Sequence, residues 1–167
     1  NMAIGRSGEP GSIFKTATLM TLLEEGKTTL STVMPTNGGK MEDFPQLNPC
    51  EETKRYERNT GKRTITVEDG LKVSSNYVFR RLVADNYLNC PDEFIDKFYE
   101  YHLHDAYTFD LSEKGGTLPE LPVPDAKMGK YDLVSAAIGY NVKETPLNIV
   151  TFYNAIANNG KMMKPYL

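Results

Sequence analysis

A serine and a lysine stand three residues apart near the start of the sequence, within the run Glu9–Lys15 (EPGSIFK). Residues at this spacing share one face of a helix, so the hydroxyl of Ser12 and the ammonium of Lys15 can meet there. A serine is a weak nucleophile unless a base lies beside it, and a lysine can act as that base when burial disfavours its charged form. The spacing therefore predicts a nucleophile and a base for acyl transfer.

The same two residues also have a purely structural interpretation. The run Pro10-Gly11-Ser12 is an ordinary helix start, in which the serine is the N-cap and accepts a backbone hydrogen bond. Lys15 is then a solvated side chain of the first turn. The pair alone does not decide between the two interpretations.

A second candidate group, Ser74-Ser75-Asn76, follows 62 residues after Ser12. It can be a capping turn between two helices, with Asn76 as the cap of the second one. It can also do chemistry, because a hydroxyl beside the nucleophile can relay a proton and an amide can bind a peptide backbone.

The helix that would carry Ser12 is predicted over residues 12–25, and it is apolar around most of its circumference, as buried helices are. Gly26 follows as a natural stop. Further helices are predicted from Thr66 to Val73, over 77–85, from Pro91, from Asp132 to Ile138, and from Thr145-Pro146 to Asn159-Gly160.

Two regions lack a helical pattern. Residues 27–63 predict a short strand over Thr28–Val33, a turn over Pro35–Gly39 that could form a hairpin, and then a loop with small β pieces. Residues 105–130 contain Gly115-Gly116 and several prolines, Pro124 among them, and are predicted to form an ordered loop. The expected fold class is therefore mainly α with a few short strands.

Composition excludes several classes of function. The 167 residues, 40% apolar and 25% charged, are typical of a globular protein, and the net charge of −3 without a basic block argues against nucleic acid as a partner. No apolar run is long enough to span a membrane. Cys50 and Cys90 are expected to be free thiols, although one bridge between them is possible. His102 and His104 are expected to be solvated, and no metal or cofactor is predicted.

Together these elements match a known order of motifs, Ser-x-x-Lys followed by Ser-x-Asn. The flanking residues extend the match, through Ile138–Asn141, Thr145–Leu147 and Phe152–Gly160 with Pro165. Over essentially all of residues 1–167 the chain resembles the transpeptidase domain of class B penicillin-binding proteins. Its closing run is most similar to the division-type subfamily of the Bacteroidetes.

This resemblance implies a D,D-transpeptidase that cross-links peptidoglycan stem peptides and that β-lactam antibiotics acylate. Ser12 would form the acyl-enzyme, Lys15 would take its proton, Ser74 would pass a proton to the departing D-alanine, and Asn76 would hold the donor peptide and orient Lys15. The resemblance also implies septal cell-wall synthesis with cell-division proteins as partners. The parent protein would lie in the periplasm, anchored in the inner membrane.

The sequence departs from the family pattern in one respect, because it contains no Lys-Thr-Gly or Lys-Ser-Gly. The resemblance places that motif on a strand after Leu167, so we expect a helical lobe of the serine β-lactamase and penicillin-binding transpeptidase fold with its central sheet largely missing. Such a piece would lack half of its oxyanion hole and would be inactive or severely impaired. The alternatives are a serine β-lactamase or D,D-carboxypeptidase, and a non-catalytic division-complex or β-lactam-sensor module.

Overall fold

The computed structural model describes residues 3, 5–107, 117–123 and 128–165. The chain divides into two compact units. One unit comprises Gly11–Pro91 and Met128–Gly139, and the other comprises Asn1–Pro10, Asp92–Lys127 and Tyr140–Leu167. Among the described helices, none combines the length and apolar composition that crossing a bilayer requires.

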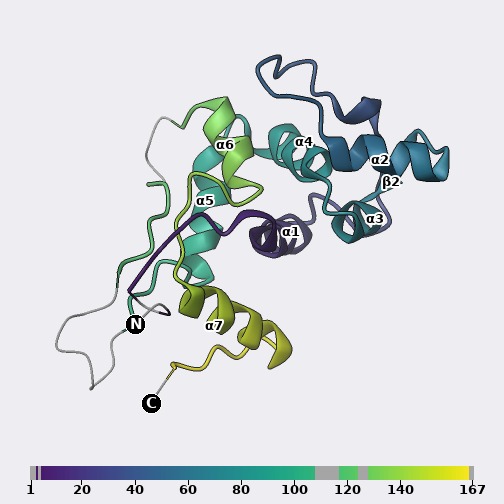
Figure 1. The fold of residues 1–167 in the computed structure, drawn as a ribbon. Helices are drawn as coiled ribbons and strands as arrows, with labels where there is room; N and C mark the ends of the chain where they lie inside the picture. Colours follow the sequence, from purple (N-terminus) through teal and green to yellow (C-terminus); the bar gives the residue numbers. More distant parts are fainter. Residues whose placement is uncertain (1–2, 4, 108–116, 124–127, 166–167) are drawn as a thin grey trace. The chain divides into compact units, whose positions relative to one another are not determined.

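The first unit is built mainly of helices (Figure 1). Its elements are η1 (Gly11–Phe14), α1 (Lys15–Glu24), β1 (Val33–Pro35), η2 (Asn37–Gly39), α2 (Glu51–Thr60), β2 (Thr64–Thr66), α3 (Val67–Lys72), α4 (Asn76–Tyr87) and α6 (Lys130–Ala136). Helix α4 packs against α1, α2, α3 and α6. The prediction of a mainly α fold with a few short strands is confirmed.

Helix α1 is buried, as its apolar composition predicts, with Ala17, Leu19 and Leu22 at 6% exposure or less. The predicted stop is also confirmed: Gly26 has a φ of +63°, which glycine adopts without strain. The beginning differs from the prediction, because residues 11–14 form a 3₁₀ turn and the α-helix starts at Lys15. The serine and the lysine therefore lie on either side of a change in helix type.

The prediction for residues 27–63 is wrong in two places. The strand begins at Val33 rather than Thr28, and it pairs antiparallel with Thr64–Thr66 instead of with a neighbouring segment. Residues 51–60, predicted to be a loop, form α2. This helix is almost entirely polar and buries only Thr53 and Tyr56, so its sequence shows no apolar stripe.

Some helix ends follow their sequence signals and others differ from the prediction. The side chain of Thr66 accepts a hydrogen bond from the Asp69 amide (3.0 Å) and caps α3, as predicted. The predicted bounds of α6 are wrong by two residues at each end: the helix begins at Lys130 with Gly129 as its N-cap, so Asp132 lies in its first turn and is not the cap, and it ends at Ala136 rather than Ile138. The cap of α4 is Ser75, which accepts from the Val78 amide (3.2 Å), so the interpretation of Asn76 as the cap is wrong.

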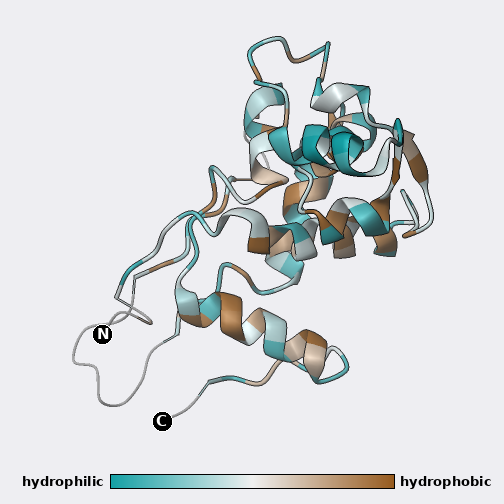
Figure 2. Ribbon diagram, turned by 45° about the vertical axis from the view of Figure 1, so that its right-hand side comes forward, coloured by the Kyte–Doolittle hydropathy of each residue, from teal (hydrophilic) through white to brown (hydrophobic). Residues whose placement is uncertain are grey.

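The second unit contains α5 (Pro91–Glu100, whose first residue belongs to the other unit) and α7 (Pro146–Ala157), together with two isolated antiparallel bridges, Gly8–Glu144 and Glu120–Lys143. Helix α7 begins as predicted, with Thr145 as N-cap and Pro146 in its first turn. Figure 2 shows hydrophobic residues along α7, and Val150, Tyr153 and Ile156 are 38–53% exposed. Of the predicted loop 105–130, residues 108–116 and 124–127 lie outside the described residues.

Candidate active site

Ser12 and Lys15 meet as their spacing predicts. Lys15 Nζ donates a hydrogen bond to Ser12 Oγ at 3.2 Å. Ser12 is exposed, whereas Lys15 is only 1% exposed and lies among the core side chains. The Ser12 hydroxyl is thus accessible from solvent while the Lys15 amine is shielded from water, an arrangement compatible with a serine nucleophile and a lysine base.

The structure also brings Ser74 to this pair. Lys15 Nζ donates to the Ser74 carbonyl oxygen at 2.7 Å and to Ser74 Oγ at 3.0 Å. One ammonium therefore joins two hydroxyls that lie 62 residues apart in the sequence. Ser74 has a φ of +54°, a left-handed conformation that is strained for a residue with a side chain.

Burial lowers the pKa of Lys15 from its usual 10.5 to about 8. The carboxylate of Glu52 opposes this effect and raises the pKa, since a nearby negative charge favours the ammonium form. With a pKa of about 8, about a tenth of the Lys15 side chains are neutral at pH 7. An ordinary lysine would be neutral only about once in several thousand molecules. Lys15 is therefore poised to accept a proton.

Asn76 is the first residue of α4 and is half-buried. Its backbone amide donates a hydrogen bond to Glu52 Oε1 at 2.6 Å. Among the described residues, Lys15 Nζ donates hydrogen bonds to Ser12 and Ser74, so these residues, rather than the predicted Asn76, orient the ammonium. The predicted role of the Asn76 side chain toward a donor peptide stays a prediction.

The turn that carries Ser12 is held by the segment after α6. The Gly11 amide donates to the Gly139 carbonyl oxygen at 3.0 Å, and Thr18 Oγ1 donates to the Ala137 carbonyl oxygen at 2.9 Å. Gly139 has a φ of +80°, and a Cβ atom there would lie 2.2 Å from Gly11 O. Only glycine permits this contact between the two backbones. The predicted motif Ile138–Asn141 contains Gly139, but the sequence does not reveal its partner.

The family model described as the penicillin binding protein transpeptidase domain matches residues 1–167. The chain belongs to the penicillin-binding protein transpeptidase family. A search of curated proteins found no significant sequence match.

Solved structures agree with this family. A peptidoglycan glycosyltransferase from Burkholderia ambifaria is 22% identical with a TM-score of 0.79, over 99% of this chain and 48% of that one. The transpeptidase domain of penicillin-binding protein 3 from Burkholderia pseudomallei is 21% identical, also with a TM-score of 0.79, over 99% and 46%. A chain of a peptidoglycan synthase complex is 26% identical with a TM-score of 0.77, over 100% and 28%. This chain thus spans less than half the length of these three structures.

Within this transpeptidase domain, α2 supplies two residues that sequence reasoning missed. Glu52 accepts the hydrogen bond from Asn76, and Thr53 Oγ1 lies 2.7 Å from Ser75 Oγ. Both Thr53 and Ser75 are fully buried. No signal pointed to these residues, because α2 itself was predicted to be a loop and polar residues are ordinary in loops.

The other titratable groups singled out from the sequence lie elsewhere. His102 and His104 follow α5, are 59% and 43% exposed, and each approaches Asp105. Cys50 is buried, Cys90 is half-buried, and no disulfide joins them in the structure. Within residues 5–107, 117–123 and 128–165, no three His, Cys, Asp or Glu side chains are placed to hold a metal ion.

Glu144, in the second unit, is a buried carboxyl that the sequence did not reveal. It is 3% exposed, and neither of its carboxyl oxygens has a hydrogen-bond partner among the described residues. Burial raises its pKa from 4.5 to about 8. Glu144 is therefore expected to be protonated at neutral pH.

Proposed function

We propose that Ser12, Lys15 and Ser74 are the nucleophile, the base and the proton relay of a D,D-transpeptidase that cross-links peptidoglycan stem peptides. The observation that carries this proposal is the hydrogen bonding of one buried ammonium to two hydroxyls, at 3.2 Å and 3.0 Å. Membership of the penicillin-binding transpeptidase family supports the reaction class.

In the proposed acylation, neutral Lys15 removes the proton of Ser12 while Ser12 Oγ attacks the carbonyl carbon between two D-alanines. The tetrahedral intermediate collapses, the C–N bond breaks, and the proton passes from Lys15 through Ser74 Oγ to the departing amine. An amine of a second stem peptide then attacks the ester carbonyl and forms a new C–N bond. The C–O bond to Ser12 breaks, and the proton that the amine loses returns to Ser12 Oγ. Asn76 would hold the donor peptide through its amide, which can both donate and accept hydrogen bonds.

The oxyanion that forms during this attack needs two donors. In this proposal the Ser12 amide is one of them, and the second comes from the strand that carries Lys-Thr-Gly in the family. No such motif occurs in these 167 residues. Loss of one oxyanion donor typically costs about 10²–10³ in rate. We therefore expect the chain as given to react very slowly and the longer protein to react normally.

We also propose a subfamily, a cellular role and a location for this protein. The run Phe152–Gly160 with Pro165 supports a division-type enzyme of the Bacteroidetes kind that acts in septal wall synthesis with cell-division partners. Its parent would be periplasmic and anchored in the inner membrane, and β-lactam antibiotics would acylate Ser12 because they mimic the donor peptide.

A fluorescent penicillin tests the proposal, applied to this chain and to the full-length protein. We expect covalent labelling of the full-length protein that Ser12→Ala abolishes and Ser31→Ala, at an exposed serine, leaves intact. Absence of labelling in the full-length protein would refute the assignment, and strong labelling of the chain alone would refute its expected impairment. Release of the label within seconds would favour a β-lactamase instead.

A further inference from the structure

We propose that Glu52 and Thr53, adjacent residues at the start of α2, are positioning residues that hold the turn Ser74–Asn76 against Lys15. This inference rests on the proposed function, because it assigns supporting residues to the same site. Neither residue belongs to the two motifs, and the sequence predicts no helix at this place.

Three consecutive residues of the turn are each held by a different side chain. Lys15 binds Ser74 through its carbonyl and its hydroxyl, at 2.7 and 3.0 Å. Thr53 Oγ1 binds Ser75 Oγ at 2.7 Å, and Glu52 Oε1 accepts from the Asn76 amide at 2.6 Å. Two of these three attachments come from the first turn of α2.

The turn needs such attachments because its conformation is strained. The φ of +54° at Ser74 is costly for a residue with a Cβ atom, and such conformations persist only where the surroundings over-determine them. Backbone hydrogen bonds also close this turn, from the Ser74 amide to Leu71 O at 2.9 Å and from the Ser75 amide to Gly70 O at 2.8 Å. If the side-chain bonds to Ser75 and Asn76 were lost, the turn would rest on these backbone bonds and on Lys15, and Ser74 would be freer to relax toward a negative φ. Its hydroxyl would then move away from Lys15 Nζ, and the proton relay would be interrupted.

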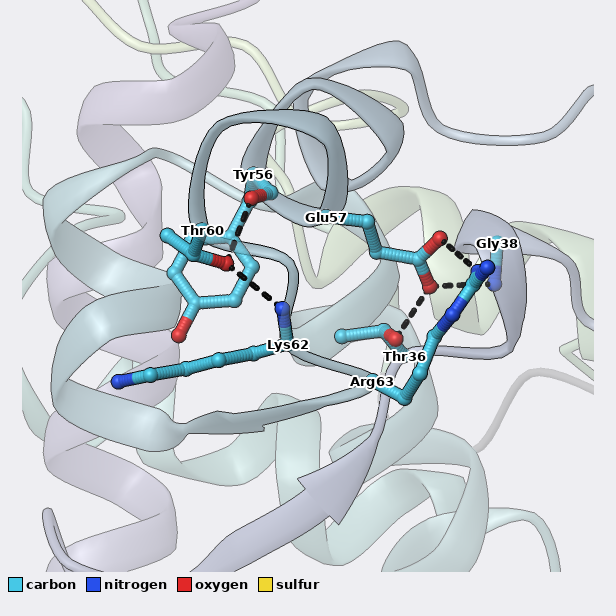
Figure 3. Close-up of polar contacts among 7 residues, drawn as sticks. All are labelled: Thr36, Gly38, Tyr56, Glu57, Thr60, Lys62 and Arg63. Atoms are coloured by element: carbon cyan, nitrogen blue, oxygen red, sulfur yellow. Dashed lines mark hydrogen bonds and ion pairs between the residues drawn. The ribbon is translucent and has the colours of Figure 1, made fainter.

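Helix α2 is itself fixed at several points, so it can serve as a rigid support. At the far end of the helix, Glu57 accepts hydrogen bonds from Thr36 Oγ1, from the Gly38 amide at 3.0 Å and from Arg63 at 2.7 Å (Figure 3). Just before α2, the Cys50 amide donates to the Gly39 carbonyl oxygen at 2.9 Å. Both ends of α2 are thus tied to η2 and the segment around it.

Glu52 also contributes through its charge. It faces the N-terminus of α4, where a negative charge is favourable, and among the charged groups that act on Lys15 it has the largest effect. The other charged or titratable groups that face Lys15 are Cys50, whose effect also raises the pKa, and Arg80, which lowers it. Glu52 therefore keeps the pKa of Lys15 higher than burial alone would make it.

The two residues can be separated by substitution. Glu52→Gln keeps an acceptor oxygen for the Asn76 amide and removes only the charge, so the pKa of Lys15 should fall while the turn keeps its shape. Thr53→Val removes the hydroxyl at nearly constant volume and leaves every charge in place. Glu51→Gln is the matched control, since Glu51 is the preceding acid, is 71% exposed and pairs with Lys54.

The first test is the rate of acylation of the full-length protein by a penicillin, measured from pH 6 to pH 10. Glu52→Gln should move the inflection of the profile to lower pH, because the carboxylate that raises the pKa of Lys15 is gone. Thr53→Val should lower the rate about tenfold at every pH without moving the inflection, and Thr53→Ser should restore it. Glu51→Gln should match the wild type. An unchanged inflection in Glu52→Gln together with an unchanged rate in Thr53→Val would overturn the inference.

A second test does not depend on activity. Hydrogen exchange of the full-length protein, followed on the peptide that contains Ser74–Val78, should accelerate at least tenfold in Glu52→Ala and in Thr53→Val, but not in Glu51→Ala. Unchanged protection in the first two variants would overturn the proposal. If the wild type is not acylated but protection falls as expected, the proposed function fails while the support of the turn by α2 stands.

Discussion

The buried ammonium of Lys15 makes a quantitative prediction about stability. In the folded protein its pKa is about 8, whereas in the unfolded chain it is close to the usual 10.5. This difference of about 2.5, at about 1.36 kcal/mol for each unit, corresponds to about 3 kcal/mol. Replacing Lys15 with methionine, an apolar side chain of similar length, removes this pH-dependent contribution to the free energy of unfolding.

The sign follows from which state holds the proton. Between pH 8 and pH 10.5 the unfolded chain keeps the Lys15 proton and the folded protein releases it, so the free energy of unfolding rises with pH. Relative to Lys15→Met, the wild type should therefore gain about 3 kcal/mol on going from pH 7 to pH 10.5. The substitution also removes the hydrogen bonds of Lys15 to Ser12 and Ser74. Their effect on the free energy of unfolding varies little with pH by comparison.

Urea unfolding followed by far-ultraviolet circular dichroism, at several pH values from 7 to 10.5, measures this difference. Titration of the other groups occurs in both proteins and cancels in the comparison. Lys72→Met is an informative control, because the hydrogen bond to Glu68 raises the pKa of the exposed Lys72 above its usual 10.5. The small stabilisation that Lys72 provides is lost only above that pH, so the difference between wild type and Lys72→Met should stay nearly constant from pH 7 to pH 10. A difference between wild type and Lys15→Met that stays constant within about 0.5 kcal/mol over this range would refute the assignment of a buried, weakly basic lysine.

Two further predictions concern residues that the sequence did not single out. Gly139→Ala should slow acylation of the full-length protein at least tenfold and destabilise it by about 2 kcal/mol or more. The reason is that the new Cβ would meet the Gly11 backbone and that a φ of +80° is strained for alanine. Acylation kinetics and urea unfolding measure the two effects, and wild-type values for both would contradict the contact. Between pH 4.5 and pH 8 the folded protein retains the Glu144 proton and the unfolded chain releases it, so the free energy of unfolding of the wild type should fall by up to about 5 kcal/mol over this range. In Glu144→Gln this fall should be absent. Parallel unfolding profiles of wild type and variant over that range would argue against a buried protonated Glu144.

The sequence predicted the candidate reacting side chains better than the residues that support them. Ser12, Lys15 and Ser74 could be picked out because few residue types act as nucleophile, base or relay, and their spacing is short or follows a known order. Helix caps such as Thr66 and Thr145 were predicted for a similar reason, since their hydrogen bonds reach only three residues along the chain.

Residues whose role depends on a distant partner could not be predicted in this way. Gly139 matters because it touches Gly11, and Thr53 matters because it binds Ser75, but neither pairing leaves a local pattern. Helix α2 was not predicted for a related reason. Polar contacts such as those of Glu57 hold it in place, whereas the hydrophobic periodicity of a sequence detects only helices that bury an apolar face.

The chemistry of this site and its stability make opposite demands. Burial gives Lys15 the lowered pKa that its proposed role as a base needs. With a pKa of about 8, however, most Lys15 side chains are still charged at neutral pH, and a charge in an apolar environment is unfavourable. The positive φ of Ser74 adds strain at the same place. A stronger negative charge beside Lys15 would relieve the first cost but would also raise the pKa and weaken the base. The half-buried Glu52 meets both demands in part: it holds the turn by a hydrogen bond to backbone while leaving the pKa of Lys15 near 8.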